Sequence, residues 1–164
     1  MILIGVGANL PGRDGRGPLA TCLAAVEALR SVPGLRVQAV SRWYATAPVP
    51  VSDQPPYVNG VVRLEGNADP AWLLVRLQAI EARAGRVRGV ANAARTLDLD
   101  VLAIGALVRA APDPVLPHPR MHAREFVLRP LIDVAPEWVH PVLGRAGAAL
   151  LAALAPQGVE LLGA

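Results

Sequence analysis

The spacing of apolar residues changes several times along this chain, and the order of these changes restricts the fold more than any other feature. The run from Ile2 to Val6 predicts a buried strand. Between Pro18 and about Leu29, apolar residues recur every three or four positions, which predicts an amphipathic helix. Residues 35–46 alternate apolar and polar side chains, as a half-buried strand does, and Tyr57 to Leu64 resumes that pattern.

The second half of the chain continues in the same order. Asp69 and Pro70 suit the N-cap and first turn of a helix, and Leu97 to Ile104 predicts the next strand. Two further helices are expected near 126–134 and 147–154. The order βαββαβ, followed by helices, predicts an α+β fold similar to the ferredoxin-like unit, in which helices cover a mainly antiparallel sheet.

Length and composition limit the class of protein. With 53% hydrophobic and 18% charged residues, positions 1–164 are expected to form one globular domain. The longest stretch of small apolar residues, 146–155, has about half the roughly 18 to 20 residues of a membrane span. The apolar start of the chain also lacks a basic leader. We therefore expect a cytoplasmic protein without a membrane partner. A monomer is expected as well.

Positive charge in this chain comes from arginine alone. The sixteen basic residues include no lysine, which excludes a P-loop because that motif requires one. The net charge of +3 and the isoelectric point of about 10.0 suggest an anionic partner. Charge alone does not distinguish between a nucleotide and a nucleic acid as this partner.

Two carboxylates stand at the head of the last predicted strand. Residues two apart on a strand face the same side and lie about 6.5 Å apart, so Asp98 and Asp100 share a face while Leu99 points to the other. Such a pair repels unless a cation lies between, and it would suit Mg²⁺, which commonly takes one or two carboxylates together with substrate phosphates. A strand end whose aspartates simply meet water is the alternative.

Arginines just upstream favour the metal interpretation. Guanidinium groups beside carboxylate-bound metal are expected in a polyphosphate site, where charge on phosphoryl oxygens must be neutralised. A solvated basic face is the alternative. A glycine-bearing loop could also close such arginines over a substrate. The arginines concerned are Arg83, Arg86, Arg88 and Arg95.

Two other segments supply side chains that suit the same kind of ligand. His118 and Arg124, in the segment PHPRMHAREF, could contact an anion, although turn hydrogen bonding is the alternative for the histidine. Tyr57 and Asn59, after a proline-rich loop, offer an aromatic face and an amide edge to a planar, polar heterocycle. The alternative is that Tyr57 is a core residue and Asn59 a turn residue.

Taken together and in this order, these segments resemble 6-hydroxymethyl-7,8-dihydropterin pyrophosphokinase, an enzyme family of folate biosynthesis. The matching stretches are GANL at 7–10, TAPV and DQPPYVN around the proline-rich loop, QAIE and GRVR at a helix end, RTLDLD, and LPHPRMHAREFVLRPL. The resemblance implies transfer of pyrophosphate from ATP to the hydroxymethyl oxygen of the pterin, which releases AMP. The implied partners are small molecules and not nucleic acid.

The resemblance also implies roles for individual residues. Asp98 and Asp100 would bind two Mg²⁺ ions that bridge the triphosphate of ATP. Arg86 and Arg95 would be catalytic and would stabilise charge on the transferred group. Further residues match positions near ATP, namely Gln78, Glu81, Arg88, His118 and Arg124, or positions of the pterin pocket, namely Thr46, Val49, Tyr57, Asn59 and Phe126.

One stretch departs from the family pattern. Members often carry an Arg-Trp-Gly-Pro-Arg run before the TLDLD segment, whereas this chain has Ala91-Asn92-Ala93-Ala94-Arg95. The arginines and aspartates are retained, so we expect the chemistry to be retained. We expect this chain to differ from other members in how the loop closes over the substrates.

Two other functions fit parts of the sequence. An Asp-x-Asp pair also marks nucleotide-sugar glycosyltransferases, which usually need a longer chain with repeated βαβ units. A βαββαβ domain with a high isoelectric point could be an RNA-binding module, which would need exposed sheet aromatics in a glycine-aromatic motif that this chain lacks. AMP production from ATP, or steeply salt-dependent RNA binding, would distinguish these functions.

Overall fold

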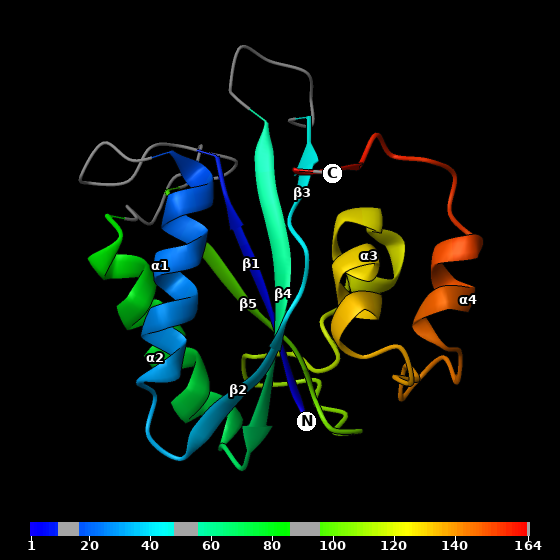
Figure 1. The fold of residues 1–164 in the computed structure, drawn as a ribbon. Coiled ribbons are helices and arrows are strands. Elements are labelled where there is room, and N and C mark those ends of the chain that lie inside the picture. The colour runs from blue at the N-terminus through cyan, green and yellow to red at the C-terminus, as the bar shows by residue number, and fades with distance from the viewer. Residues whose placement is uncertain (10–16, 48–55, 86–95, 164) are drawn as a thin grey trace.

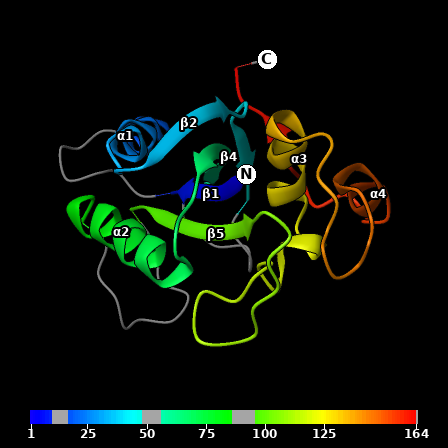
Figure 2. The same ribbon diagram turned by 90° about the horizontal axis from the view of Figure 1, so that it is seen from below.

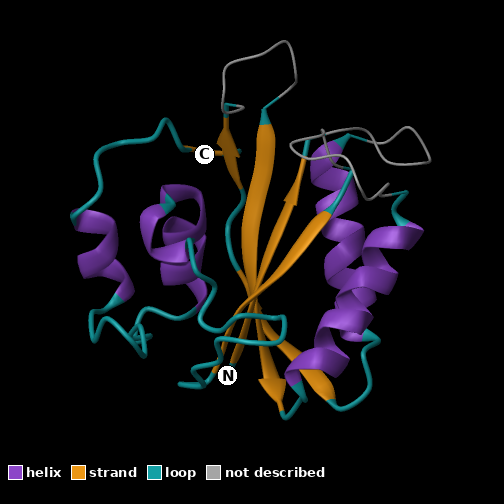
Figure 3. Cartoon of the chain, turned by 180° about the vertical axis from the view of Figure 1, so that it is seen from behind, coloured by secondary structure: helices purple, strands orange, loops and turns teal. Residues whose placement is uncertain are grey.

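A central antiparallel sheet separates two groups of helices in the computed structural model, which describes residues 1–9, 17–47, 56–85 and 96–163 (Figures 1 and 2). Strand β1 (Ile2–Ala8) lies between β4 (Tyr57–Gly66) and β5 (Asp98–Ile104) and is antiparallel to both. Helices α1 and α2 lie on one side of this sheet, and α3 and α4 lie on the other (Figure 3). The predicted α+β class is confirmed.

The predicted strand 35–46 is divided in two in the structure. Strand β2 (Leu35–Val40) pairs with the second half of β4, and β3 (Tyr44–Thr46) pairs with its first half. The short β6 (Glu160–Leu161) is added outside β3. With β2 and β3 sharing one position beside β4, the order of the four principal strands is that of the predicted ferredoxin-like unit.

Helices α1 (Pro18–Arg30) and α2 (Pro70–Arg83) begin where the sequence predicts. Both have proline in the first turn, where its missing N–H costs no hydrogen bond. The carboxylate of Asp69 caps α2 by accepting a hydrogen bond from the backbone N–H of Trp72 at 3.0 Å. Helix α1 packs on β1 and β4, and α2 packs on β5.

The opposite side of the sheet is covered by the C-terminal third of the chain. A short 3₁₀ turn (Met121–Ala123) leads into α3 (Glu125–Val134), which packs on β4, and α4 (Gly147–Ala152) packs on α3. None of the helices within the described ranges has the length and apolar character needed to cross a bilayer.

Strand alternation divides the core in two. Successive side chains of a strand point to opposite faces, so each strand contributes to both cores. The core under α1 and α2 includes Ile4, Val6, Val62, Leu99 and Val101. The core under α3 includes Leu3, Val61, Leu102, Leu128, Leu131 and Trp138. The candidate site lies on the α3 side of the sheet and borders this second core, since Val61 and Leu102 also line it.

A loop beyond α3 is held together by a buried histidine. The ring of His140, which is 4% exposed, lies beside the rings of Trp138 and His122 at centroid distances of 5.6 and 6.0 Å. Its Nδ1 accepts hydrogen bonds from the backbone N–H groups of Val142 (3.2 Å) and Leu143 (3.1 Å). Burial, and to a smaller extent His122, lowers the pKa of His140 below its ordinary value of 6.5.

We expect the free energy of unfolding to fall as the pH is lowered below about 6.5. The unfolded chain then takes up a proton at His140, whereas the folded chain, in which the pKa of this ring is lower, resists protonation. The stabilisation is therefore complete above the unfolded pKa and is lost as the pH falls towards the folded one. Urea unfolding at a series of pH values between about 7.5 and 5 measures this dependence.

The variant His140→Asn separates this histidine from the others. Its side-chain oxygen can still accept from the two N–H groups, but it does not titrate in this pH range. The pH dependence should shrink without vanishing, because burial and then Arg124 also lower the pKa of His118. A dependence as steep in the variant as in the parent protein would contradict the assignment to His140.

Candidate active site

A cavity of about 630 Å³ opens on the α3 side of the sheet, which is within the usual range for small-molecule sites. Its walls come from β1, β3, β4, β5 and the first turn of α3, so residues far apart in the sequence meet there. Seven of the predicted site residues line it: Thr46, Tyr57, Asn59, Asp98, Asp100, Arg124 and Phe126.

Strand register explains how the cavity is built. Gly7 of β1 lies opposite Asn59 of β4 on one side and Asp98 of β5 on the other, and Gly5 lies opposite Asp100. Directly opposed residues of antiparallel strands point to the same face. The two glycines therefore form a floor without side chains, bordered by two half-buried carboxylates on one side and an amide on the other.

The amide of Asn59 is fixed by its neighbours. Its Nδ2 donates a hydrogen bond to Oγ1 of Thr46 at 2.8 Å, and both residues are 8% exposed. Its Oδ1 lies only 2.8 Å from the position that a β-carbon on Gly7 would occupy. The absence of a side chain at Gly7 therefore lets the carbonyl end of the amide lie over the cavity floor.

Two aromatic residues and two arginines also line the cavity. The guanidinium of Arg124 lies over the ring of Phe126, with its Cζ 5.5 Å from the ring centroid, in a cation–π arrangement. Tyr57 and Arg120 also line the cavity. The cavity thus offers aromatic side chains, positive charge and carboxylates in one lining.

His118 lies beside the cavity and not in its lining. Its Nδ1 accepts a hydrogen bond from the backbone N–H of Arg120 at 3.2 Å, which leaves the proton of the neutral ring on Nε2. Burial, followed by the charge of Arg124, lowers its pKa, and the carboxylate of Asp98 acts in the opposite direction. At neutral pH the ring is uncharged and presents one N–H donor close to these charged groups.

Two of the predicted ATP-binding residues lie on α2, outside the cavity lining. Gln78 is half-buried there. Glu81 is 2% exposed, and its Oε2 accepts a hydrogen bond from the backbone N–H of Leu99 at 2.8 Å. Because Leu99 stands between Asp98 and Asp100, this contact holds the strand segment that carries both carboxylates. A direct role of either α2 residue in binding ATP stays a prediction.

Four predicted site residues fall outside the described ranges. They are Arg86 and Arg95, predicted to be catalytic, Arg88, predicted to bind ATP, and Val49, predicted to line the pterin pocket.

The structure adds cavity residues that the sequence did not indicate. Gly5 and Gly7 occupy alternate positions of the first strand and line the cavity. Glycine inside a strand often indicates that another group approaches the backbone closely, so their spacing could have indicated a site here. Arg120 stands in the quoted PHPRMHAREF segment. Gln157 lies near the C-terminus, where neither spacing nor composition marks it.

Asp98 and Asp100 fit the protein's usual share of a Mg²⁺ site. A protein usually supplies one or two carboxylate ligands to Mg²⁺, and substrate phosphates and water supply the remaining ligands. Among the described residues, no group of three or more His, Cys, Asp or Glu side chains could enclose a metal ion. A metal held by this pair would therefore need substrate oxygens as further ligands.

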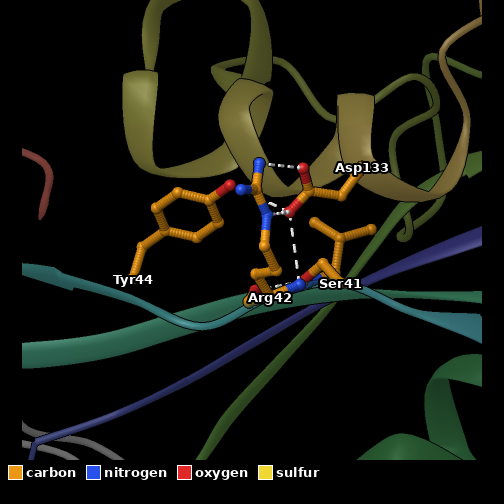
Figure 4. Close-up of polar contacts among 5 residues, drawn as sticks. Ser41, Arg42, Tyr44 and Asp133 are labelled. Atoms are coloured by element: carbon orange, nitrogen blue, oxygen red, sulfur yellow. Dashed lines mark hydrogen bonds and ion pairs between the residues drawn. The ribbon is translucent and has the colours of Figure 1, made fainter. Parts of the chain in front are cut away.

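A polar cluster, the Asp133 clamp (Arg42, Tyr44 and Asp133), joins β3 to α3 (Figure 4). Oδ2 of Asp133 accepts hydrogen bonds from the backbone N–H of Arg42 (3.2 Å), its Nε (3.3 Å) and the hydroxyl of Tyr44 (2.8 Å), and Oδ1 accepts from Nη2 of Arg42 (2.8 Å). Burial and the contact with Asp133 raise the pKa of Tyr44, which keeps its hydroxyl protonated as a donor. The clamp ties the strand that carries Thr46 to the helix that carries Phe126.

Comparison with known proteins connects this chain to one family. The family model described as 7,8-dihydro-6-hydroxymethylpterin-pyrophosphokinase (HPPK) matches residues 3–136. The 2-amino-4-hydroxy-6-hydroxymethyldihydropteridine pyrophosphokinase of Pseudomonas aeruginosa is 42% identical over 161 residues, which cover 98% of this chain and 96% of that protein. The Synechocystis protein of the same name is 38% identical over 144 residues, 87% of this chain and 70% of that protein.

Solved structures show the same fold. The HPPK-DHPS protein of Plasmodium falciparum, crystallised with SDX-DHP, superposes with a TM-score of 0.67 over 92% of this chain. This chain corresponds to 43% of that longer protein and is 14% identical to it. At this sequence identity the structural similarity shows a shared fold and gives no information about the reaction.

Proposed function

Because the chain belongs to the 7,8-dihydro-6-hydroxymethylpterin-pyrophosphokinase family, we propose that it transfers pyrophosphate from ATP to 6-hydroxymethyl-7,8-dihydropterin in folate biosynthesis. The products are AMP and the pterin diphosphate. The cytoplasmic location and the monomeric state expected from the sequence belong to this proposal.

One observation carries the proposal: a single cavity joins a carboxylate pair suited to metal and phosphate with a pocket suited to a flat, polar heterocycle. Asp98 and Asp100 stand on one side of the glycine floor, and Asn59 stands on the other. The reaction needs both halves in contact, since the transferred group must pass from the nucleotide to the pterin.

The pterin half is built for a planar ring with hydrogen-bonding edges. We propose that the ring lies over Gly7 and against the aromatic side chains of Tyr57 and Phe126. The amide of Asn59, held by Thr46, would pair with the ring edge. Since the hydrogen bond to Thr46 already fixes the amide, little orientational freedom is lost when the pterin binds. Val49 is proposed to bind the pterin as well.

The phosphate half collects positive charge and neutral donors. Arg124 and Arg120 line the cavity, and the Nε2–H of His118 is a neutral donor beside them. We assign Arg124 and His118 to the triphosphate of ATP, together with Gln78, Glu81 and Arg88. The support for Glu81 is indirect, because its carboxylate accepts from the backbone of the strand between the two aspartates.

Two Mg²⁺ ions are proposed to bind at Asp98 and Asp100. When bound, such ions neutralise phosphate charge and make the β-phosphorus a better electrophile. The protein's own contribution is to hold both carboxylates on one face of β5, with Leu99 anchored beneath them in the core.

The proposed reaction forms one bond and breaks another. The hydroxymethyl oxygen attacks the β-phosphorus, and the bond from this phosphorus to the α,β-bridging oxygen breaks. AMP departs with that oxygen, and the hydroxymethyl proton is released. Arg86 and Arg95 are proposed to stabilise the charge that shifts to the bridging oxygen during this step.

Mass spectrometry of products tests the proposal directly. The purified protein is incubated with Mg²⁺, ATP and hydroxymethyl-dihydropterin, and AMP and pterin diphosphate are expected in equal amounts. ADP with a pterin monophosphate would indicate simple phosphoryl transfer, and an unchanged ATP pool would reject ATP as the donor. Omission of Mg²⁺ should abolish both products.

A further inference from the structure

The C-terminal segment, residues 154–163, crosses the first turn of α3 on its way from α4 to the sheet (Figures 1 and 3). It is anchored at its end by β6, where Glu160 pairs with Ala45 and the backbone N–H of Leu162 donates to the carbonyl of Trp43 at 2.9 Å. The family match ends at residue 136, so this segment lies beyond it. One of its residues, Gln157, nevertheless lines the cavity.

Gln157 makes three hydrogen bonds, two to the first residue of α3 and one to the 3₁₀ turn before it. Its side-chain Oε1 accepts from the backbone N–H of Glu125 at 2.9 Å, and its Nε2 donates to the carbonyl of Ala123 at 3.0 Å. Its own backbone N–H donates to Oε2 of Glu125 at 2.6 Å. The two residues thus bind each other reciprocally across 32 positions of sequence.

This pairing supplies what the helix start lacks. The first N–H groups of a helix have no partner inside it, and the side chain of Arg124, the N-cap residue of α3, does not cap them. Gln157 satisfies the first of these donors from outside the helix. The carboxylate of Glu125 is itself buried, with a side chain 5% exposed, and is held on its other oxygen by Nε of Arg129 at 2.8 Å.

The residues on either side of Glu125 both line the cavity. Arg124 precedes it and Phe126 follows it, and these two side chains lie against each other. Holding the backbone at Glu125 holds Phe126 because a helix fixes the directions of successive side chains, and it restrains Arg124, the extended N-cap residue, through the adjoining peptide. A turn freed from Gln157 would let this pair leave the positions in which it borders the cavity.

We propose that Gln157 is a positioning residue of the substrate site, which keeps the Arg124–Phe126 pair facing the cavity by capping α3 from the C-terminal segment. The inference rests on the proposed function, since Arg124 and Phe126 are assigned there to the triphosphate and to the pterin. It assigns a role in the site to a part of the chain outside the family match.

The variant Gln157→Met tests this role because it keeps the length of the side chain and removes both side-chain hydrogen bonds. The backbone N–H of residue 157 remains, so the segment should stay docked on Glu125. We expect KM for hydroxymethyl-dihydropterin and for ATP to rise roughly three- to tenfold, as for the loss of an ordinary hydrogen bond. The value of kcat should change less than twofold, because the reacting groups are untouched.

Hydrogen exchange and a control variant separate positioning from general destabilisation. The amide of Glu125 should exchange faster in Gln157→Met, with little change at amides of β1 and β4. Glu160→Gln, an exposed change in the same segment, should leave both KM values as in the parent protein. A parent protein that forms no AMP would reject the proposed function. A parent protein that is active, with KM values unchanged in Gln157→Met, would reject the role of Gln157 alone.

Discussion

We expect the variant Asp98→Asn to form AMP about a thousandfold more slowly than the parent protein, and Asp100→Asn to behave similarly. Asparagine keeps the shape of the side chain but removes the negative charge that binds a divalent cation. Loss of one preorganised electrostatic contact typically costs a factor of about a hundred to a thousand in rate, and loss of a bound metal affects several contacts at once. Single-turnover measurements with saturating Mg²⁺ and ATP give the chemical rate.

The fold should survive these changes. The core under α1 and α2 takes its side chains from the other face of β5, namely Leu99 and Val101, and both aspartates are half-buried at the cavity. The same substitution at Asp113, which is exposed in a surface loop, is the matched control and should leave the rate unchanged. Normal Mg²⁺-dependent activity in Asp98→Asn would contradict the proposed metal site.

Periodicity predicts most of the fold because each helix and strand buries one face or one stripe. It does not predict the division of residues 35–46, although the apolar–polar alternation is interrupted at Val40 and Ser41. The division depends on contacts made by distant residues: Oγ of Ser41 accepts from the backbone N–H of Val61, and Asp133 draws the next residues towards α3. Such contacts have no local pattern that a sequence window could reveal.

The candidate site could be predicted in part for the same reason. The aspartate pair could be predicted because residues two apart on a strand point to the same face. The position of Asn59 opposite Gly7 depends on strand register, and the contact of Gln157 with Glu125 depends on a crossing that the chain makes after α4. Asn59 is a candidate from its place beside Tyr57 and from the family resemblance, whereas the roles of Gly7 and Gln157 need the structure.

The second large effect is expected at Gly7. A β-carbon there would lie 2.8 Å from Oδ1 of Asn59, closer than such contacts normally occur. In Gly7→Ala the amide must turn away, which strains its hydrogen bond to Thr46, and the methyl group occupies the cavity floor. We expect KM for hydroxymethyl-dihydropterin to rise about ten- to a hundredfold, the range for a lost polar contact together with a steric conflict in the pocket.

The affinity for ATP distinguishes this effect from a general loss of structure. Gly7 does not have a positive φ, so alanine meets a crowded side chain and not a forbidden backbone conformation. Binding of a non-hydrolysable ATP analogue, measured by calorimetry, should therefore stay within about twofold of the parent value, while binding of the pterin weakens. Gly17→Ser, where an added β-carbon meets nothing within 4 Å, is the control for a glycine substitution as such. If Gly7→Ala weakened the binding of the ATP analogue and of the pterin equally, the glycine floor would support the whole cavity. The assignment of the Asn59 side of the cavity to the pterin would then be wrong.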